Sequence, residues 1–243
     1  MSEVTVMHTI FAVFIVLMLS LGVAGAEDSA SAYTDPVTGM EFVKVQDGLY
    51  MGKYEVTNAQ FKKFRPAHNL KKYTHNGHSF DGDNQPVVYV SQSDAFLFGD
   101  WLSRKTGMKY RLPEENEWER ACKEGGDTET YWDDDRDACL YANVCDKTCK
   151  RAFGFKSETF DCDDGFAVTS PVGRKKPNKF GLYDMLGNVW EWTNTWKVIS
   201  RDVGVMEGGS WLDEPAGFGC SNSTMAPTSL KDNNIGFRLV LEK

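Results

Sequence analysis

The sequence contains few histidines and no concentrated run of basic residues. Four of its 243 residues are histidine, and the longest run of Lys and Arg is residues 174–176, which we interpret as a solvated loop. Acidic residues outnumber basic ones by 35 to 27, which gives a formal net charge of -8. Nucleic-acid binding requires a concentrated basic surface, so this composition argues against it. The GxSxG motif, the phosphate loop and the Ser-His-Asp order are also missing from the sequence.

Long apolar runs are scarce too, and the main one lies near the N-terminus. Residues 11–23 are almost wholly apolar, and a small-x-small sequence ending at Ala26 follows them, as is typical of a signal peptide. We expect a signal peptide at residues 1–26, a flexible linker at 27–36 and one domain at 37–243. Such a chain would be exported to the periplasm or the cell exterior. An uncleaved membrane anchor is the alternative, because no Lys or Arg precedes the apolar run.

Three motifs in the C-terminal half are the most informative part of the chain. They are GLYDMLGNVWEW (residues 181–192), EGGSW (207–211) and IGFRLV (235–240). The first fits neither a helical nor a strand period, so its role must lie in loop geometry and side-chain packing. The order of the motifs resembles the sulfatase-modifying-factor family, whose founding member is the formylglycine-generating enzyme. Further segments between residues 54 and 173 are similar to successive signatures of the same family.

The resemblance implies an α+β fold of the C-type-lectin-like type. We expect low regular secondary structure, two principal helices, short strands and long ordered loops. Capping-box patterns at Thr57 and Ser91 mark the starts of the two helices, and a short acidic helix follows at residues 114–122. The clearest strand compositions are at residues 40–44, 49–54, 206–210 and 236–241. We interpret residues 65–85 as a variable surface loop.

Long irregular loops lose much conformational entropy when they become ordered, and a hard cation bound by oxygen atoms can hold them in place. The resemblance implies two calcium sites. The first comprises the side chains of Asn143 and Asp164 with the carbonyls of Val144 and Phe166. The second comprises the carboxylates of Asp184 and Glu191 with the carbonyls of Gly187 and Val189. The alternative is that Asp184 and Glu191 only cap the loop and form salt bridges.

Six cysteines follow the expected cleavage site, and an even number in an exported chain favours disulfides. We favour a bond between Cys139 and Cys162, because these residues flank the first calcium site. Cys145 with Cys149 is a second candidate pair. A zinc site built from Cys145, Cys149 and Cys162 is the alternative. Cys122 is either bonded or a buried free thiol.

The resemblance also identifies where catalysis would occur. The formylglycine-generating enzyme binds copper(I) through two cysteines shortly after its GGS motif, because copper(I) requires soft thiolate ligands. In register, these two positions are Asp213 and Phe218 in this chain, and Cys220 lies two residues too late. We therefore expect no catalytic residues and no copper. An oxidoreductase of the formylglycine-generating type remains the disfavoured alternative.

A non-catalytic role in binding an unidentified ligand or protein is the function that we favour. We expect its binding surface to include exposed aromatic and polar side chains, namely Trp190, Trp211, Asp213, Phe218 and Asn222. One alternative is a receptor whose C-terminal segment, residues 212–235, is diversified by a retroelement. Another is an exported scaffold subunit that contacts a second protein. Contact with a membrane is expected only if the N-terminal segment is uncleaved.

Overall fold

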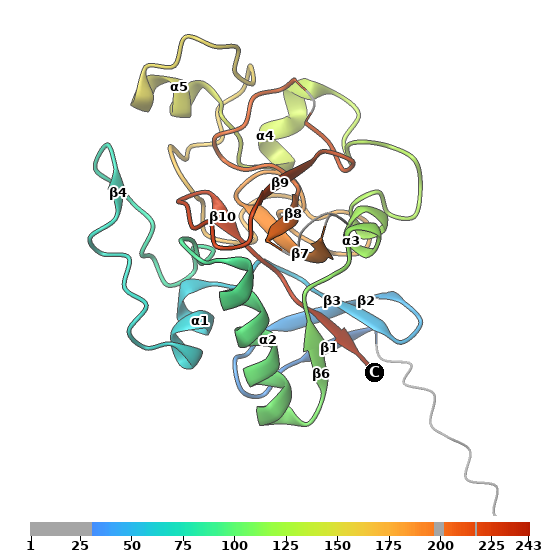
Figure 1. Cartoon of the computed structure of the whole chain (residues 1–243). Helices are drawn as coiled ribbons and strands as arrows, with labels where there is room; N and C mark the ends of the chain where they lie inside the picture. The colour runs from blue at the N-terminus through green and yellow to red at the C-terminus, as the bar shows by residue number, and fades with distance from the viewer. Residues whose placement is uncertain (1–30, 197–201, 217) are drawn as a thin grey trace, which may run out of the picture.

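The computed structural model describes residues 31–196, 202–216 and 218–243 (Figure 1). The expected signal peptide at residues 1–26 therefore lies outside the described residues. Within the described ranges, no helix is both long and apolar enough to cross a membrane. The expectation of a flexible linker is wrong for its last part, because Ala32–Thr34 form strand β1 and pair with the next strand.

The first sheet has five antiparallel strands in the order β1-β2-β3-β11-β6. The remaining members are β2 (Glu41–Gln46), β3 (Leu49–Gly52), β6 (Lys109–Arg111) and β11 (Val240–Glu242). β11 lies between β3 and β6, so Leu241 is paired with Tyr50 on one side and Tyr110 on the other. The strand nearest the C-terminus is thus an inner strand of the sheet that begins the domain.

The second sheet has four strands in the order β10-β7-β8-β9. They are β7 (Trp190–Trp196), β8 (Val203–Glu207), β9 (Ser223–Pro227) and β10 (Ile235–Gly236), and β10 runs parallel to β7. A separate two-stranded hairpin consists of β4 (Thr74–His75) and β5 (His78–Ser79). The motif at residues 181–192 is therefore a loop that becomes a strand at Trp190, which its sequence period did not predict.

Two helices, α1 (Asn58–Phe64) and α2 (Gln92–Thr106), begin with the capping boxes that the sequence predicts. Thr57 accepts a hydrogen bond from the Gln60 backbone, and Ser91 accepts one from the Asp94 backbone. α2 ends at Gly107, whose φ of 75° favours glycine. The predicted acidic helix is α3 (Glu115–Cys122), with Trp118 fully buried on its inner side.

The structure adds a short 3-10 helix, η1 (Asp135–Asp137), and two short helices, α4 (Ala138–Tyr141) and α5 (Lys147–Phe153). Asp146 caps α5 by accepting hydrogen bonds from the backbones of Thr148 and Cys149. Figure 1 shows α4 and α5 at the end of the molecule opposite β6 and the C-terminus.

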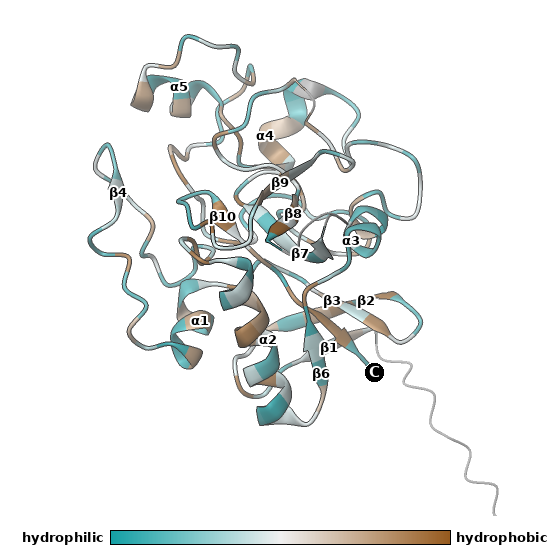
Figure 2. Cartoon of the chain, viewed as in Figure 1, coloured by the Kyte–Doolittle hydropathy of each residue, from teal (hydrophilic) through white to brown (hydrophobic). Residues whose placement is uncertain are grey.

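Buried aromatic side chains hold the helices against the sheets. Phe61 of α1, Phe98 of α2 and Phe237 contact one another with ring centroids 5.6, 6.1 and 5.7 Å apart. Such ring pairs add about 0.5–1.5 kcal/mol each beyond their buried area. Figure 2 shows hydrophobic and hydrophilic patches side by side on α2, as expected for a helix with one face in the core. The fold is therefore the predicted α+β arrangement of short strands, few helices and long ordered loops.

Candidate functional site

Arg238 and Glu191 form a fully buried ion pair between the two sheets, with 0% and 1% of their side chains exposed. Arg238 Nε donates to both carboxylate oxygens of Glu191 at 2.9 and 2.7 Å, and Nη2 donates to Oε1 at 2.6 Å. Trp118 Nε1 donates to Glu191 Oε2 at 2.8 Å. The guanidinium also donates to the carbonyls of Gly52, Tyr183 and Asp184. Arg238 thereby joins β3 to the loop that precedes β7.

Two further carboxyl groups, those of Glu55 and Asp184, lie in the same interior. Glu55 accepts hydrogen bonds from Asn188 Nδ2 at 2.6 Å and from the Val189 backbone at 3.2 Å. Asp184 Oδ2 accepts one from the Gly173 backbone at 2.7 Å, whereas Asp184 Oδ1 is buried without a hydrogen-bond partner among the described residues. Burial raises the pKa of Asp184 to about 6, and burial together with the Asp184 charge raises that of Glu55 well above its usual value.

The residues predicted for the second calcium site contribute unequally. Glu191 is held by Arg238 and Trp118, which is the salt-bridge arrangement considered as the alternative. Asp184 keeps Oδ1 available for a cation. Gly187 has a φ of 80°, and a Cβ there would lie 2.3 Å from the Asn143 carbonyl oxygen, so the loop requires glycine at this position. The second site stays a prediction that depends mainly on Asp184 and on the carbonyls of Gly187 and Val189.

The residues predicted for the first calcium site lie close together in the structure. Asn143 is fully buried, its Nδ2 donates to the Val168 carbonyl at 3.1 Å, and its Oδ1 has no partner among the described residues. Asp164 accepts hydrogen bonds from the backbones of Phe166 at 2.8 Å and Val144 at 3.0 Å. Burial raises the pKa of Asp164 to about 6. Asn143 Oδ1 is a buried amide oxygen without a donor, and Asp164 is a half-buried carboxylate that accepts from the next residue along, Val144; oxygen atoms of these two kinds suit a hard cation.

Lys175 lies beside the first site and corrects the interpretation of residues 174–176 as a solvated loop for this one residue, whereas Arg174 and Lys176 are exposed as expected. Its side chain is buried, and Nζ donates to the carbonyls of Cys139 at 3.0 Å and Asp164 at 3.2 Å. Burial lowers the pKa of this amine, whereas the charge of Asp164 opposes that shift. The acidic neighbourhood explains why a lysine is tolerated in the interior.

The two predicted calcium segments are joined to each other. Asn143 and Gly187 form a parallel β-bridge, and the Asn188 backbone donates to the Asn143 carbonyl at 2.7 Å. Asn188 Oδ1 accepts from Asn143 Nδ2 at 3.0 Å and from the Ser170 backbone at 2.9 Å. Sequence reasoning assigned no role to Glu55, Asn188 or Arg238. Asn188 and Arg238 fall inside the motifs quoted above, and Glu55 lies in a further segment similar to the family, so their polar character beside apolar residues was the available signal.

The structure contains three disulfides, and all six cysteines lie in its described part. They join Cys139 to Cys162, Cys145 to Cys149, and Cys122 to Cys220. The first two pairs are those that the sequence favoured. The zinc alternative is wrong, because the sulfur atoms of a disulfide cannot provide the thiolates that zinc requires. Cys122 is likewise not a free thiol.

The two positions that the resemblance aligns with the copper-binding cysteines carry Asp213 and Phe218, neither of which has a thiol. Asp213 accepts a hydrogen bond from Ser210 Oγ, and burial raises its pKa. Asn234 Nδ2 donates to the same hydroxyl at 3.2 Å. Phe218 packs its ring edge against Phe160, with centroids 5.3 Å apart. Cys220, the nearest cysteine in sequence, is bonded to Cys122.

The expectation that Trp190 and Trp211 are exposed on a binding surface is wrong, because only 8% and 1% of their areas are exposed. Trp211 packs against Phe80 and Phe153 with ring centroids 6.1 and 5.6 Å apart. These tryptophans therefore support the loops from inside the domain. Of the other residues expected on that surface, Asp213, Phe218 and Asn222 are all partly exposed.

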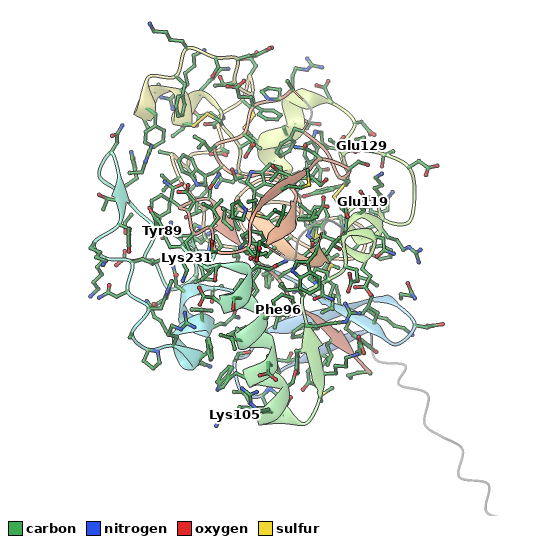
Figure 3. All side chains as sticks on the ribbon, viewed as in Figure 1. Tyr89, Phe96, Lys105, Glu119, Glu129 and Lys231 are labelled. Atoms are coloured by element: carbon green, nitrogen blue, oxygen red, sulfur yellow. A yellow bond between two sulfur atoms is a disulfide. The ribbon has the colours of Figure 1, made fainter. Side chains whose placement is uncertain are left out.

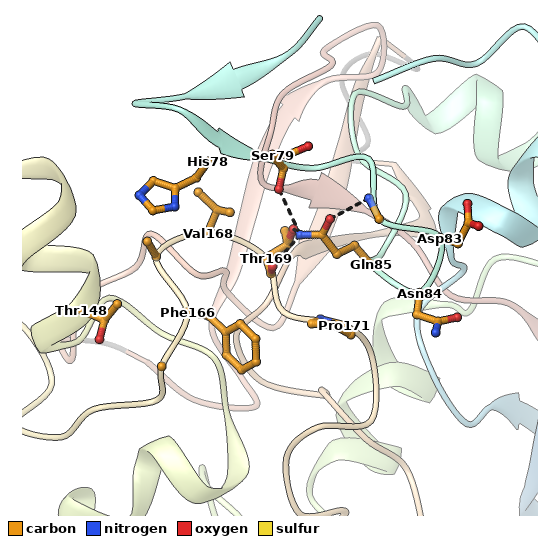
Figure 4. A pocket seen from close by; sticks show the side chains of 13 residues that line it. His78, Ser79, Asp83, Asn84, Gln85, Thr148, Phe166, Val168, Thr169 and Pro171 are labelled. Atoms are coloured by element: carbon orange, nitrogen blue, oxygen red, sulfur yellow. Dashed lines mark hydrogen bonds between the residues drawn. The ribbon is translucent and has the colours of Figure 1, made fainter. Parts of the chain in front are cut away.

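A pocket of about 530 Å³ lies between the β4–β5 hairpin, the loop at residues 82–85 and the segment at residues 165–171. Gln85 joins its two walls, because Nε2 donates to the Ser79 carbonyl at 3.1 Å and to the Thr169 carbonyl at 2.8 Å (Figure 4). Its lining includes His78, Ser79, Asn84, Gln85, Phe166 and Thr169. Sequence reasoning missed this pocket because it treated residues 65–85 as a variable loop.

The family model for the sulfatase-modifying factor enzyme 1-like domain matches residues 20–243. The chain belongs to this family. It is 36% identical over 161 residues to the mouse protein named inactive C-alpha-formylglycine-generating enzyme 2, which covers 63% of this chain and 48% of that protein. It is 43% identical over 118 residues to the formylglycine-generating enzyme of Mycobacterium tuberculosis, covering 47% of this chain and 35% of that enzyme. The chain thus spans about half or less of the length of these two relatives.

Solved structures of the same fold include PvdO from Pseudomonas aeruginosa, with a TM-score of 0.70, 22% identity and coverage of 87% of this chain and 98% of that one. Treponema denticola variable protein 1 matches with a TM-score of 0.67, 19% identity and coverage of 88% and 92%. At these identities the likeness shows the fold alone. Within the sulfatase-modifying-factor family, the question of chemistry then depends on the side chains at the two positions that Asp213 and Phe218 occupy.

Proposed function

We propose that this chain is an exported, non-catalytic binding domain of the sulfatase-modifying-factor family, stabilised by calcium. The observation that carries the proposal is the absence of a free thiol at the positions where family enzymes bind copper(I). Asp213 is a hard oxygen ligand held by Ser210, Phe218 offers no ligand atom, and Cys220 is bonded to Cys122. The mouse relative that matches this chain carries the word inactive in its name, which agrees with such a role.

The pocket tethered by Gln85 is the place where we expect a ligand to bind. Its residues offer hydroxyl, amide and imidazole groups and the carboxylate of Asp83 beside the ring of Phe166, which suits a polar ligand. One wall begins at Gly165, directly after Asp164 of the first predicted calcium site. Ordering of that loop by calcium would therefore shape the pocket as well as stabilise the domain.

Calcium would supply positive charge to the buried oxygen atoms of Asn143 and Asp184 and to the half-buried carboxylate of Asp164. The chain itself directs two buried oxygens, Asn143 Oδ1 and Asp184 Oδ1, away from any hydrogen-bond donor among the described residues. Leaving such groups unsatisfied costs about 1–3 kcal/mol each. A bound cation offsets that cost, so these oxygens support the calcium assignment more directly than the acidic composition does.

Export is supported by the three disulfides, because such bonds persist in oxidising compartments. The N-terminal segment that would direct export precedes the described residues. N-terminal sequencing of the protein purified from its native source would establish whether cleavage occurs after Ala26. Intact residues 1–26 in a membrane fraction would instead indicate an anchor.

The proposal is tested by offering the purified, oxidised protein copper(I) and a peptide containing a cysteine in a sulfatase context. We expect no high-affinity copper(I) binding in competition with a chelator and no peptide aldehyde by mass spectrometry. Calcium should be present by elemental analysis. Aldehyde formation that disappears in a Cys220→Ser variant would overturn the non-catalytic assignment.

A further inference from the structure

A second pocket of about 530 Å³ lies apart from the first and shares no lining residue with it. It is formed by the segment after α1, by Tyr89 ahead of α2 and by Lys231 ahead of β10. Figure 3 labels Tyr89 and Lys231, which lie next to each other on this side of the molecule. The polar and aromatic residues of its lining include Arg65, His68, Lys72, Tyr73, Tyr89 and Lys231.

The lining of this pocket is basic, although the chain as a whole has a net charge of -8. Three of its nine lining residues are Arg65, Lys72 and Lys231, and none of the nine is acidic. Asp94 of α2 forms two ion pairs, one with Arg65 Nη1 at 2.5 Å and one with Lys231 Nζ at 2.5 Å. Asp232 is the other nearby carboxylate, and its Oδ1 accepts from the Asn233 backbone. Among these five side chains, the three cations outnumber the two carboxylates, so positive charge is in excess.

Two tyrosines form an aromatic wall in the same pocket. The rings of Tyr73 and Tyr89 are stacked with centroids 4.2 Å apart, and Lys72 Nζ lies 5.1 Å from the Tyr73 centroid. Tyr89 has a φ of 57°, a backbone conformation that costs energy for an aromatic residue. Its backbone donates to the Asp232 carbonyl at 2.8 Å, which helps to hold the ring in place. Such strain is commonly found where a side chain must be positioned for a ligand.

One polar atom of the lining also lacks a partner. His68 Nε2 is buried and has no hydrogen-bond partner among the described residues. A buried imidazole nitrogen without a partner costs free energy, and a ligand atom recovers it only when the side chain turns toward the pocket. Charge, ring stacking and this nitrogen are three separate features of one pocket.

We propose that this pocket binds a small organic anion, in which an oxyanion group contacts the basic residues and a ring stacks on the tyrosines. Arg65 suits the group because a guanidinium has several N–H donors for carboxylate, sulfate or phosphate oxygens, and the ion pair with Asp94 engages Nη1. Lys72 and Lys231 add charge from two other segments of the chain. This anion site is independent of the Gln85 pocket and of the calcium sites, so it adds a second ligand to the proposed function.

The probes are phenyl phosphate, phenyl sulfate and benzoate, which separate the three oxyanions, with inorganic phosphate and phenol as the two halves of the ligand. Titration calorimetry on the oxidised, full-length protein measures each affinity at low and high salt. We expect at least one ring-bearing anion to bind more tightly than inorganic phosphate or phenol, and to bind more weakly at high salt. Absence of binding by all three ring-bearing anions would overturn the proposal.

A matched pair of variants tests the location. Lys72→Gln removes a cation from the lining and should weaken binding about tenfold, the effect of losing one charge-assisted contact. Lys71→Gln removes the same charge one residue away, on an exposed side chain outside the lining, and should leave the affinity unchanged. Equal losses in the two variants would mean non-specific attraction and would overturn the assignment. Tyr73→Leu should weaken the ring-bearing probe but not inorganic phosphate.

Discussion

Cys122, the last residue of α3, is bonded to Cys220, which lies 98 residues later in the chain. The bond attaches the segment between EGGSW and β9 to the helix that carries Trp118. It also engages the sulfur atom of Cys220, the cysteine nearest in sequence to the positions of Asp213 and Phe218. One covalent link thus serves stability and leaves Cys220 without a free thiol.

Replacing both partners, as Cys122→Ser with Cys220→Ser, should lower the free energy of unfolding by about 4 kcal/mol, because a bond across so many residues strongly restricts the unfolded chain. Urea denaturation under non-reducing conditions measures the loss. The matched control replaces Cys145 and Cys149, which are separated by only 4 residues. Its expected loss is smaller, so a larger loss in the control would contradict the loop-length argument.

Arg238→Met should be strongly destabilising, by about 3–5 kcal/mol, because it leaves the buried Glu191 carboxylate without its cation. Glu191→Gln in the same chain should recover much of that loss, since both charges are then absent. Denaturant unfolding of the two single variants and the double variant gives the coupling energy. Additive losses would show that the ion pair does not act as a unit.

In calcium-free buffer, stability should fall as pH rises from about 4 to about 7. Folding raises the pKa of Asp184 from 3.8 to about 6, so the folded chain holds this proton more tightly than the unfolded chain. The contribution is therefore present below about pH 4 and lost above about pH 6, and it amounts to about 3 kcal/mol. Glu55, whose pKa burial also raises, acts in the same direction.

Asp184→Asn should flatten this pH profile and raise stability at neutral pH without calcium. Asp133→Asn, at an exposed position, is the control and should leave the profile as it is. Free energies of unfolding measured at several pH values make the comparison. An Asp184→Asn profile as steep as that of the parent protein would show that another group titrates.

Calcium should raise the melting temperature, and Asp164→Asn should reduce that increase. Saturation at about a hundredfold excess over the dissociation constant corresponds to about 2.7 kcal/mol of stabilisation. Asp163→Asn is the adjacent control, because Asp163 is exposed and pairs with Arg151. Differential scanning calorimetry with and without calcium measures both. Equal responses of the two variants would remove Asp164 from the site.

The sequence predicted the helices well and the binding surface poorly, for a physical reason. The capping boxes at Thr57 and Ser91 are local signals, so they specify where α1 and α2 begin without knowledge of the rest of the chain. The burial of Trp190 and Trp211 depends on segments that are distant in sequence. Gln85 meets Thr169 84 residues away, and no local pattern encodes that contact.

For the residues of the predicted calcium sites, the sequence indicated only part of the arrangement that the structure shows. The resemblance placed Asn143 and Asp164 together, and the structure brings them to one buried region. It could not reveal that Glu191 is held by Arg238, because the two residues are separated by 47 positions in the sequence. This pairing of two charges that are distant in sequence became apparent only in the structure.

The place of β11 between β3 and β6 has a consequence for how the domain is made. β3 and β6 are synthesised early, yet each obtains its shared neighbour only when synthesis has reached residues 240–242. The first sheet therefore stays incomplete while the earlier part of the chain is being synthesised. Assembly of this sheet must wait until residues 240–242 have been made, so β3 and β6 lack their shared partner during most of the synthesis of the domain.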